Sequence, residues 1–190
     1  ALPTVIYDGD LSALAAVVAT AVRLGLAVEV NGWDGWWLAR EGGATWEAGP
    51  GLAVLNAVAA RHLAGLGCRA VMISCEADAG KLAACCANAD TPLILPVFGR
   101  PALMSTRAWS KAPGWTMSDA RGSITIAPRK EGPVVVLRPA EPYDWRGRAI
   151  TGVAAAHVEM DLSASPDPVG EWRSRPDPKA HVFNLDRDLR

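Results

Sequence analysis

Apolar segments of strand length alternate with helix-like segments through the first hundred residues of this chain. The clearest strands are residues 70–75 and 93–98, and each is an almost unbroken apolar run. Such runs are typical of parallel strands that are covered on both faces. A helix predicted over residues 78–88 joins them, and strand–helix–strand units are connected by right-handed crossovers. The alternation therefore predicts an α/β fold built on a parallel sheet.

The same alternation extends toward the N-terminus. Asp10 is suited to cap the start of a helix, and Gly25 is suited to end it. Between residues 52 and 66, apolar side chains recur at helical spacing. The expected elements of this region are a helix over 11–24, a strand over 27–31, a short helix over 32–40, a strand around 45–47 and a helix over 52–66.

Tryptophan is unusually frequent, with eight residues against two phenylalanines and two tyrosines. Trp33, Trp36 and Trp37 are spaced so that they share one face of the short helix. We expect this face to pack in the core, because tryptophan carries a large apolar surface. Stacking of these rings on an aromatic ligand is the alternative.

The pattern changes after Gly99. Residues 115–126 predict a β-hairpin with its turn at 119–122, and residues 134–137 predict a third strand beside it. A strand near 156–162 and a short helix over 168–173 then resume the alternation. We expect residues 1–190 to form a single domain, in which residues 1–99 and 150–175 supply the βα units of a partial barrel and residues 110–140 form a small β-hairpin insertion.

The number of expected parallel strands limits the architecture. Five or six strands are fewer than the eight that close a barrel of about 250 residues. We therefore expect an incomplete (β/α) TIM-barrel-like parallel sheet. An open strand edge of such a sheet needs another strand to pair with. Either this chain is the C-terminal part of a longer protein, or it is a half-barrel that a partner chain or an upstream domain completes.

Composition and charge exclude several classes of protein. The chain has 190 residues, of which 50% are hydrophobic, and no apolar run approaches the roughly 20 residues that span a bilayer. No signal peptide opens the chain, so we expect a cytoplasmic protein without a membrane partner. Residues 1–99 carry five basic and nine acidic side chains, whereas residues 100–190 carry fourteen and eleven. The basic second half could meet an anionic substrate, but a mixed solvated surface is the favoured interpretation, because no block of five like charges occurs in the chain.

Four cysteines lie within a short apolar stretch of the chain. Cys68, Cys75, Cys85 and Cys86 lack the paired C-x-x-C spacing of many zinc and iron–sulfur sites. Cys85 and Cys86 point to different faces of the predicted helix, so at most one of them can join Cys75. We expect buried, reduced thiols and no metal site.

Two charged residues follow predicted strands, where α/β proteins place their active residues. Glu76 comes directly after the strand over 70–75, and its carboxylate could accept a proton or bind an amine. Facing the positive end of a helix dipole is its structural alternative. Arg100 follows the strand over 93–98 and could hold a carboxylate or a phosphate. An ion pair between Arg100 and Glu76 is the structural alternative.

Three further polar residues are candidates for substrate binding. Asn31 and Glu47 lie at or near the ends of the first two strands. Asn56 falls inside the helix predicted over 52–66, where its amide needs partners. Packing of Asn56 against a neighbouring loop is the simpler interpretation, and contact with a ligand is the other. We expect Glu76 and Arg100 as the catalytic pair, with Glu47, Asn31 and Asn56 around them.

Four stretches of the chain resemble the peptidase U-32 (collagenase-like) family in their order and spacing. The resemblance covers roughly residues 20–165. The stretches are residues 45–56 (TWEAGPGLAVLN), 66–76 (LGCRAVMISCE), 96–104 (PVFGRPALM) and 118–122 (SDARG).

This resemblance implies a barrel-like fold. Members of the family are described as proteases, and some hydroxylate RNA or quinones. Several members carry a cysteine-bound iron–sulfur cluster. Here Trp109 stands where the family commonly has a cysteine, and no cysteine follows Cys86. We therefore expect neither an iron–sulfur cluster nor another cofactor.

Two hypotheses of function follow. In the first, the chain is a peptidase U-32-like protein that acts in RNA or quinone modification or in peptide hydrolysis, with a Glu/Arg site at the strand ends. Arg100 would orient the substrate, and Glu76 would handle a proton. In the second, the chain is a non-catalytic half-barrel subunit or interaction domain that completes the fold of a partner.

Overall fold

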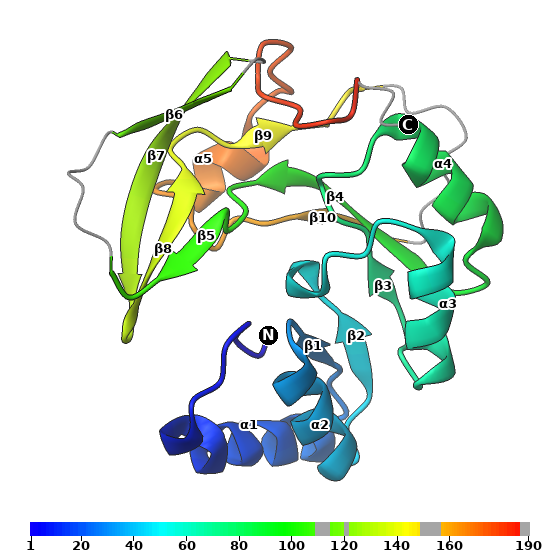
Figure 1. Cartoon of the computed structure of the whole chain (residues 1–190). Coiled ribbons are helices and arrows are strands. Elements are labelled where there is room, and N and C mark those ends of the chain that lie inside the picture. The colour runs from blue at the N-terminus through cyan, green and yellow to red at the C-terminus, as the bar shows by residue number, and fades with distance from the viewer. Residues whose placement is uncertain (109–114, 120–121, 149–156, 187–190) are drawn as a thin grey trace. The chain divides into compact units, whose positions relative to one another are not determined.

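The computed structural model describes residues 1–108, 115–119, 122–148 and 157–186. The chain divides into two compact units, whose elements are labelled in Figure 1. The first unit comprises residues 1–96, 149–158 and 184–190, and the second comprises residues 97–148 and 159–183. The predicted insertion over 110–140 falls within the second unit. Residues 110–114 of that insertion and its turn residues 120–121 lie outside the described residues.

A parallel sheet forms the centre of the first unit. Its strands follow the order β1-β2-β3-β4, and each neighbouring pair is parallel. The last residues of β4 belong to the second unit. This finding confirms the predicted α/β class and the parallel sheet. The strands are β1 (Val28–Val30), β2 (Trp46–Ala48), β3 (Val71–Met72) and β4 (Leu93–Gly99).

Four helices alternate with these strands along the chain. Three of them connect adjacent parallel strands, and right-handed crossovers place those three on the same face of the sheet. Short 3-10 turns, η1 (Asp8–Asp10) and η2 (Pro50–Leu52), precede the first and third helices. The helices are α1 (Leu11–Arg23), α2 (Trp33–Glu41), α3 (Ala57–Gly65) and α4 (Ala79–Asn88).

The two faces of the sheet differ in chemistry. On one face, Val28 packs with Leu2, Val18 and Leu38, which come from the N-terminal segment, α1 and α2. Because side chains alternate along a strand, Glu29 points to the other face. Glu29 is in register with Glu47 of β2, so this face is polar over β1 and β2.

The N-terminal segment runs alongside β1. The Leu2 N–H donates to the Glu29 carbonyl at 2.8 Å, and the Thr4 carbonyl lies where a Cβ on Gly32 would approach it to 2.7 Å. Since Leu2 lies beside Glu29 and Thr4 beside Gly32, the segment and β1 have the same direction. It therefore occupies the position of a parallel strand that precedes α1.

Helix positions follow the predictions closely, with one exception. The observed α1, α2 and α4 lie within one or two residues of the predicted bounds, and so does α5 (Pro168–Arg173). The helix predicted over 52–66 begins later, at Ala57, because the chain first makes the turn η2 and a left-handed residue, Ala53, at φ 48°.

Two further expectations need correction. The strand predicted over 70–75 is shorter, since β3 spans only two residues. The tryptophan face is not wholly buried: Trp33 and Trp37 remain 55% and 52% exposed. The buried residues of α2 are instead Gly35, Leu38 and Ala39. Gly35 has no side chain, so α2 lies close to Leu2 and Val30 at this position.

The second unit contains an antiparallel sheet of order β5-β8-β7-β6. The hairpin predicted over 115–126 corresponds to β6 and β7, and the third strand predicted over 134–137 corresponds to β8. The strand β5 of this sheet was not predicted. β9 (Tyr143–Asp144) pairs antiparallel with the end of β4, and β10 (His157–Met160) also neighbours β4. The four strands of the antiparallel sheet are β5 (Met104–Thr106), β6 (Thr116–Asp119), β7 (Gly122–Glu131) and β8 (Val134–Pro139).

The described residues contain no helix that is both long and apolar enough to cross a lipid bilayer.

Candidate functional site at the carboxyl edge of the parallel sheet

The carboxyl ends of β1, β2 and β3 meet at one edge of the parallel sheet. We call this the carboxyl edge and define it as Asn31 after β1, residues 49–51 after β2 and residues 74–76 after β3. Ligands of open parallel sheets bind in the crevice outside these strand ends. Three of the five predicted site residues, Asn31, Glu47 and Glu76, lie at or directly before this edge.

Asn31 is buried and binds three separate parts of the first unit. Its Nδ2 donates to the Leu2 carbonyl at 3.0 Å and to Glu29 Oε1 at 2.7 Å. Its Oδ1 accepts the Gly51 N–H at 2.9 Å. Asn31 therefore fixes the N-terminal segment and the loop after β2 to the end of β1. Its predicted role in substrate binding stays a prediction, while its structural role is evident.

The glycines after β2 are required by the close approach of this loop to Asn31. A Cβ on Gly49 would lie 2.8 Å from Glu29 Oε1 and would approach Asn31 Oδ1 still more closely. A Cβ on Gly51 would overlap the Asn31 carbonyl oxygen. The segment Gly49-Pro50-Gly51 thus serves packing, because only residues without a Cβ leave room for the Asn31 hydrogen bonds.

A cavity of about 490 Å³ opens beside the carboxyl edge of β1 and β2. Its walls combine apolar side chains with a few polar groups, as small-molecule sites do. Neither Glu47 nor Asn56 lines it. The residues that line it include Asn31, Trp33, Asp34, Leu52, His62 and Leu63.

Glu47 is held by an ion pair. Its carboxylate lies 2.8 Å from Nη2 of Arg69, and the side chains of Glu47 and Arg69 are 23% and 61% exposed. Glu29, its neighbour in register, binds Asn31 instead. Each of the two adjacent carboxylates therefore has its own hydrogen-bond donor, which reduces their mutual repulsion.

Asn56 caps α3 and does not lie inside a helix. Its Oδ1 accepts the Ala59 N–H at 2.9 Å, and the residue is exposed. Asparagine is a favoured N-cap because its side chain satisfies one of the free N–H groups of the first turn. The prediction that Asn56 lies inside a helix over 52–66 was wrong, since the left-handed Ala53 delays the start of the helix to Ala57.

Glu76 presents an exposed carboxylate at the end of β3. Its backbone is held on both sides: its N–H donates to Ser74 Oγ at 3.2 Å, and its carbonyl accepts from Asn184 Nδ2 at 2.9 Å. The structure gives its carboxylate no ion pair among the described residues. Glu76 is therefore the predicted site residue that presents an exposed carboxylate to a ligand.

The neighbouring thiol of Cys75 is a poor nucleophile. Burial, together with the smaller effect of the nearby Glu76 carboxylate, raises its pKa to about 12. Only the thiolate reacts, so at pH 8 we expect Cys75 to alkylate roughly 1000-fold more slowly than an ordinary thiol. Iodoacetamide labelling with peptide mass analysis tests this, and the urea-unfolded protein is the control. Equal labelling rates in the folded and the unfolded chain would contradict it.

Arg100 is engaged within the second unit. Its Nη1 and Nη2 donate to the two carboxylate oxygens of Glu171 at 2.9 and 2.5 Å, and its Nε donates to the Ala140 carbonyl at 3.0 Å. The Arg100 and Glu171 side chains are 8% and 19% exposed. Arg100 thus makes the bidentate ion pair that arginine favours, with Glu171 and not with Glu76. Glu76 belongs to the first unit and Arg100 to the second, so a site common to both stays a prediction.

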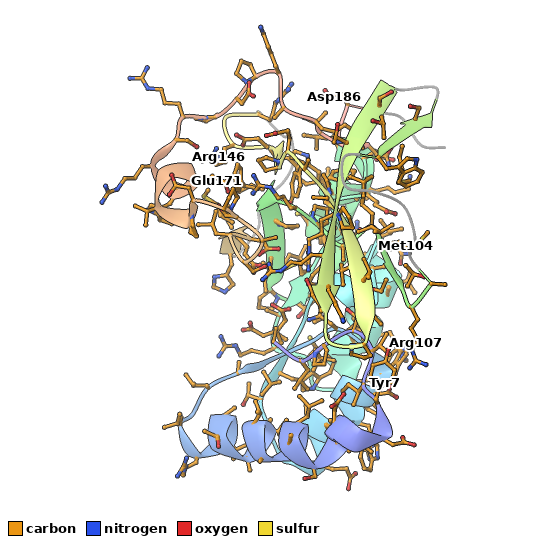
Figure 2. All side chains as sticks on the ribbon, turned by 90° about the vertical axis from the view of Figure 1, so that its left-hand side faces the viewer. Tyr7, Met104, Arg107, Arg146, Glu171 and Asp186 are labelled. Carbon is orange, nitrogen blue, oxygen red and sulfur yellow. The ribbon has the colours of Figure 1, made fainter. Side chains whose placement is uncertain are left out.

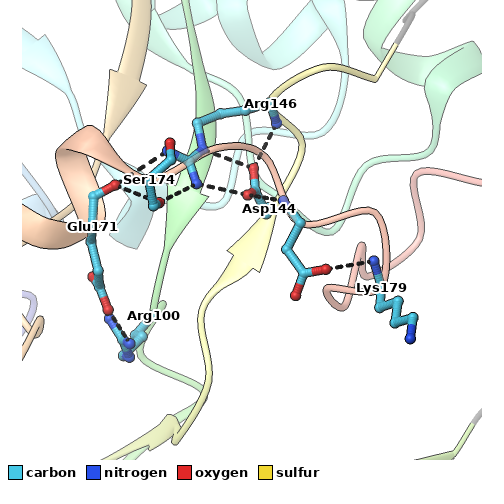
Figure 3. A network of polar contacts seen from close by, with 7 residues as sticks. Arg100, Asp144, Arg146, Glu171, Ser174 and Lys179 are labelled. Carbon is cyan, nitrogen blue, oxygen red and sulfur yellow. Dashed lines mark hydrogen bonds and ion pairs between the residues drawn. The ribbon is translucent and has the colours of Figure 1, made fainter.

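A second ion pair lies beside the first (Figure 3). Arg146 Nε and Nη2 donate to the two carboxylate oxygens of Asp144 at 3.0 and 2.8 Å. Arg146 also donates to the carbonyls of Glu171 and Ser174, and its guanidinium lies 4.3 Å from the ring centre of Phe98. Through these contacts Arg146 connects α5 and the residue after it with Phe98 of β4 and Asp144 of β9.

The electrostatics of the two carboxylates reflect these contacts. Hydrogen bonds from Arg100 hold the pKa of Glu171 below its usual 4.5, against the opposing effect of burial. Burial raises the pKa of Asp144, but hydrogen bonds from Arg146 and from the Asp177 N–H outweigh it, so the net pKa is lowered. Both carboxylates are therefore ionised at neutral pH, as the two ion pairs require.

No family model, curated protein or solved structure matches this chain. The function is therefore argued from the residues and their geometry.

We also looked for a metal site and for paired cysteines in the part of the chain that the structure describes. There, no group of three or more His, Cys, Asp or Glu side chains is arranged to hold a metal ion. The four cysteines are free thiols, of which Cys68 and Cys85 are buried and Cys75 and Cys86 are partly buried.

Sequence reasoning missed several residues of these sites. His62 and Asp34 beside the cavity each lie on a helix, where nothing in the local sequence marks them. Glu171 is 71 residues from Arg100 in the chain. The signal available for Glu171 was its place in the first turn of a predicted helix, which indicates a helix-dipole role and not its arginine partner.

Proposed function

We propose that this chain is a peptidase U-32-like protein that binds its substrate at the carboxyl edge of an incomplete, barrel-like sheet. The reaction is peptide hydrolysis or the modification of RNA or a quinone. The four motifs identified in the sequence support the family. The consecutive parallel order β1-β2-β3-β4 supports it as well, because a barrel winds in this order.

One observation carries the site: an exposed carboxylate, which has no ion pair within the described part of the chain, follows a buried strand at the carboxyl edge. Glu76 is held in place through its backbone, while its side chain is exposed to solvent. A positioned carboxylate of this kind accepts a proton from a water or from a substrate group. In this proposal Asn31 and the glycines after β2 shape the edge, and Arg100 stays in its ion pair with Glu171.

The proposal is tested with Glu76→Gln, which keeps the size of the side chain and removes its basicity. The full chain is incubated with gelatin, with a structured RNA or with a soluble quinone, and products are identified by mass spectrometry. Loss of a general base is expected to lower the turnover of the accepted substrate by about 100-fold or more. Glu41→Gln, at the exposed end of α2, is the control and should leave turnover unchanged. Turnover of none of the three, or equal turnover by Glu76→Gln, overturns the proposal.

A half-barrel that completes the fold of a partner is the second candidate. It is favoured by the segment of residues 2–4, which lies along β1 in the position of a strand. The backbone hydrogen bond that the structure describes between them runs from the Leu2 N–H to the Glu29 carbonyl. A full strand supplied by another chain would bind this edge more completely. Co-expression with the product of the adjacent coding sequence tests this candidate. A soluble complex that survives purification supports it, and a chain that stays uncomplexed under these conditions argues against it.

A further inference from the structure

Helix α5 is bound to the rest of the second unit through one face. The Glu171 carboxylate accepts from Nη1 and Nη2 of Arg100. Arg146 donates to the carbonyls of Glu171 and Ser174, and its Nη2 donates to Ser174 Oγ at 3.1 Å. Figure 2 shows Glu171 on α5 with Arg146 close to it. The direction of the Glu171 side chain therefore defines the inner face of α5.

The opposite face of α5 carries two apolar side chains and a cation. At about 100° per residue, Val169 and Arg173 each lie about 160° around the helix from Glu171, and Trp172 lies about 60° from Val169. The exposure of these residues agrees with this placement. Val169 and Trp172 are 59% and 64% exposed, and Arg173 is exposed as well. α5 therefore presents an indole ring and a guanidinium on one outer face.

The chain that follows α5 adds further cations to this side. Ser174 is extended, with φ −65° and ψ 150°, and side chains alternate along an extended chain. Ser174 Oγ faces Arg146, and Pro176 lies against Gly147, so Arg175 between them points outward and is exposed. Lys179 is exposed, and its side chain extends away from the ion-pair network (Figure 3). We call the outer residues the α5 surface; they are Val169, Trp172, Arg173, Arg175 and Lys179.

The charge of the α5 surface suits an anion. Its three cations have no ion pair within the part of the chain that the structure describes. The neighbouring exposed carboxylates are those of Asp167 and Asp177, and each already accepts a backbone N–H, from Gly170 at 3.0 Å and from Lys179 at 2.9 Å. Three free cations thus surround an exposed indole ring, with two carboxylates beside them.

We propose that the α5 surface binds single-stranded nucleic acid without regard to its sequence. One base stacks on the Trp172 ring, and neighbouring phosphates meet Arg173, Arg175 and Lys179. Stacking of this kind tolerates every base, because each base has a π-face. The contacts of Glu171 and Ser174 hold the backbone in place before the strand arrives, which lowers the entropy lost on binding.

The chemistry of the α5 surface favours this partner over other anions. An acidic peptide would meet the three cations but would leave the indole ring uncovered. An anionic membrane requires a longer apolar face, whereas α5 has six residues and exposes two apolar side chains, Val169 and Trp172. A nucleic acid duplex keeps its bases stacked on one another, so it cannot cover Trp172. An unpaired strand uses both the cations and the ring.

Fluorescence anisotropy of labelled oligonucleotides, titrated with the full chain, tests the proposal. The probes are an oligouridine and an oligodeoxythymidine of about 12 nucleotides, and a duplex of the same length. In 50 mM NaCl both single strands are expected to bind with a dissociation constant on the order of 10 µM, and the duplex about tenfold more weakly. Three phosphate contacts predict a slope of about −2 for log affinity against log salt, so 200 mM NaCl weakens binding by about 20-fold.

Two variants separate stacking from charge. Trp172→Ala is expected to lower the affinity for oligouridine by about tenfold without changing the salt slope, and Trp172→Phe should retain most of the affinity. Trp37→Ala on α2, where the indole is 52% exposed, is the matched control. Arg175→Gln is expected to reduce the salt slope by about 0.7. Arg23→Gln, at the exposed end of α1, should leave the slope unchanged. Far-UV circular dichroism verifies that each variant is folded.

Four outcomes overturn the inference. They are no binding of either single strand up to 200 µM protein, equal binding of the duplex, an affinity that Trp172→Ala leaves unchanged, and binding to phosphatidylglycerol vesicles but not to oligouridine. The inference goes beyond the proposed function, because it is measured as binding and not as turnover. Glu76→Gln should therefore bind oligouridine as the wild type does, and binding without turnover would contradict the proposed function alone.

Discussion

Replacing Glu171 with alanine is expected to lower the free energy of unfolding of the second unit by about 3 kcal/mol. The substitution leaves the Arg100 guanidinium, which is 8% exposed, without its anionic partner. Removal of one member of a buried ion pair costs more than the pair itself contributes, because the remaining charge has lost both its water and its counter-ion. Urea unfolding followed by circular dichroism measures the change.

Glu131→Ala is the matched control in the same unit. The Glu131 carboxylate lies 3.5 Å from Nη2 of Arg138 and is 39% exposed, so solvent screens this pair. Its loss is expected to cost less than about 1 kcal/mol. Equal destabilisation by the two variants would show that burial of the Arg100–Glu171 pair makes no special contribution.

The contribution of Glu171 also depends on pH. Arg100 lowers the pKa of Glu171 in the folded protein below the ordinary value of 4.5. The stabilisation by the carboxylate is therefore complete above pH 4.5 and is lost as the pH falls through the lowered pKa. We expect the difference in stability between wild type and Glu171→Ala to be largest near pH 7 and to shrink below pH 4. A difference that stays constant from pH 7 to pH 3 would contradict the ion pair.

Asn31→Ala is expected to destabilise the first unit by about 3 kcal/mol. The substitution removes three hydrogen bonds at a buried position and leaves the Leu2 carbonyl and the Gly51 N–H without this partner. Unpaired buried polar groups retain their full desolvation cost. The loop after β2 should also loosen, which hydrogen exchange at the Gly51 amide would detect as faster exchange.

Asn88→Ala, in the same unit, provides the comparison for Asn31→Ala. The Asn88 Nδ2 donates to the Ala84 carbonyl at 2.7 Å at an exposed position near the end of α4. Water can replace this bond, so the expected change is within about 0.5 kcal/mol. If Asn31→Ala were equally mild, the three hydrogen bonds of Asn31 would not hold the carboxyl edge together.

The elements that could be predicted from the sequence are those specified by nearby residues. The predicted bounds of α1, α2, α4 and α5 agree with the structure to within one or two residues, because apolar spacing and end signals such as Gly25 after α1 act within a few residues. The apolar segments that contain β3 and β4 indicated a parallel sheet for the same reason. β5 and β9 were missed, since these short strands do not lie within an unbroken apolar run such as those that marked β3 and β4.

The place of the candidate site in the fold could be predicted from the sequence, but the contacts of its side chains could not. Topology places Asn31 and Glu76 at the carboxyl edge, and the sequence revealed that much. It could not reveal that Asn56 caps α3, because this depended on Ala53 adopting a left-handed conformation first.

The sequence by itself determined the alternation of strands and helices and the residues that follow each strand. Only the tertiary structure decided which of those residues have a free side chain. Arg100 meets Glu171 across 71 residues, and Asn31 meets Gly51 across 20. Buried polar groups need hydrogen-bond partners, and the fold can bring such a partner from a distant part of the chain. The spacing of residues in the sequence does not identify that partner.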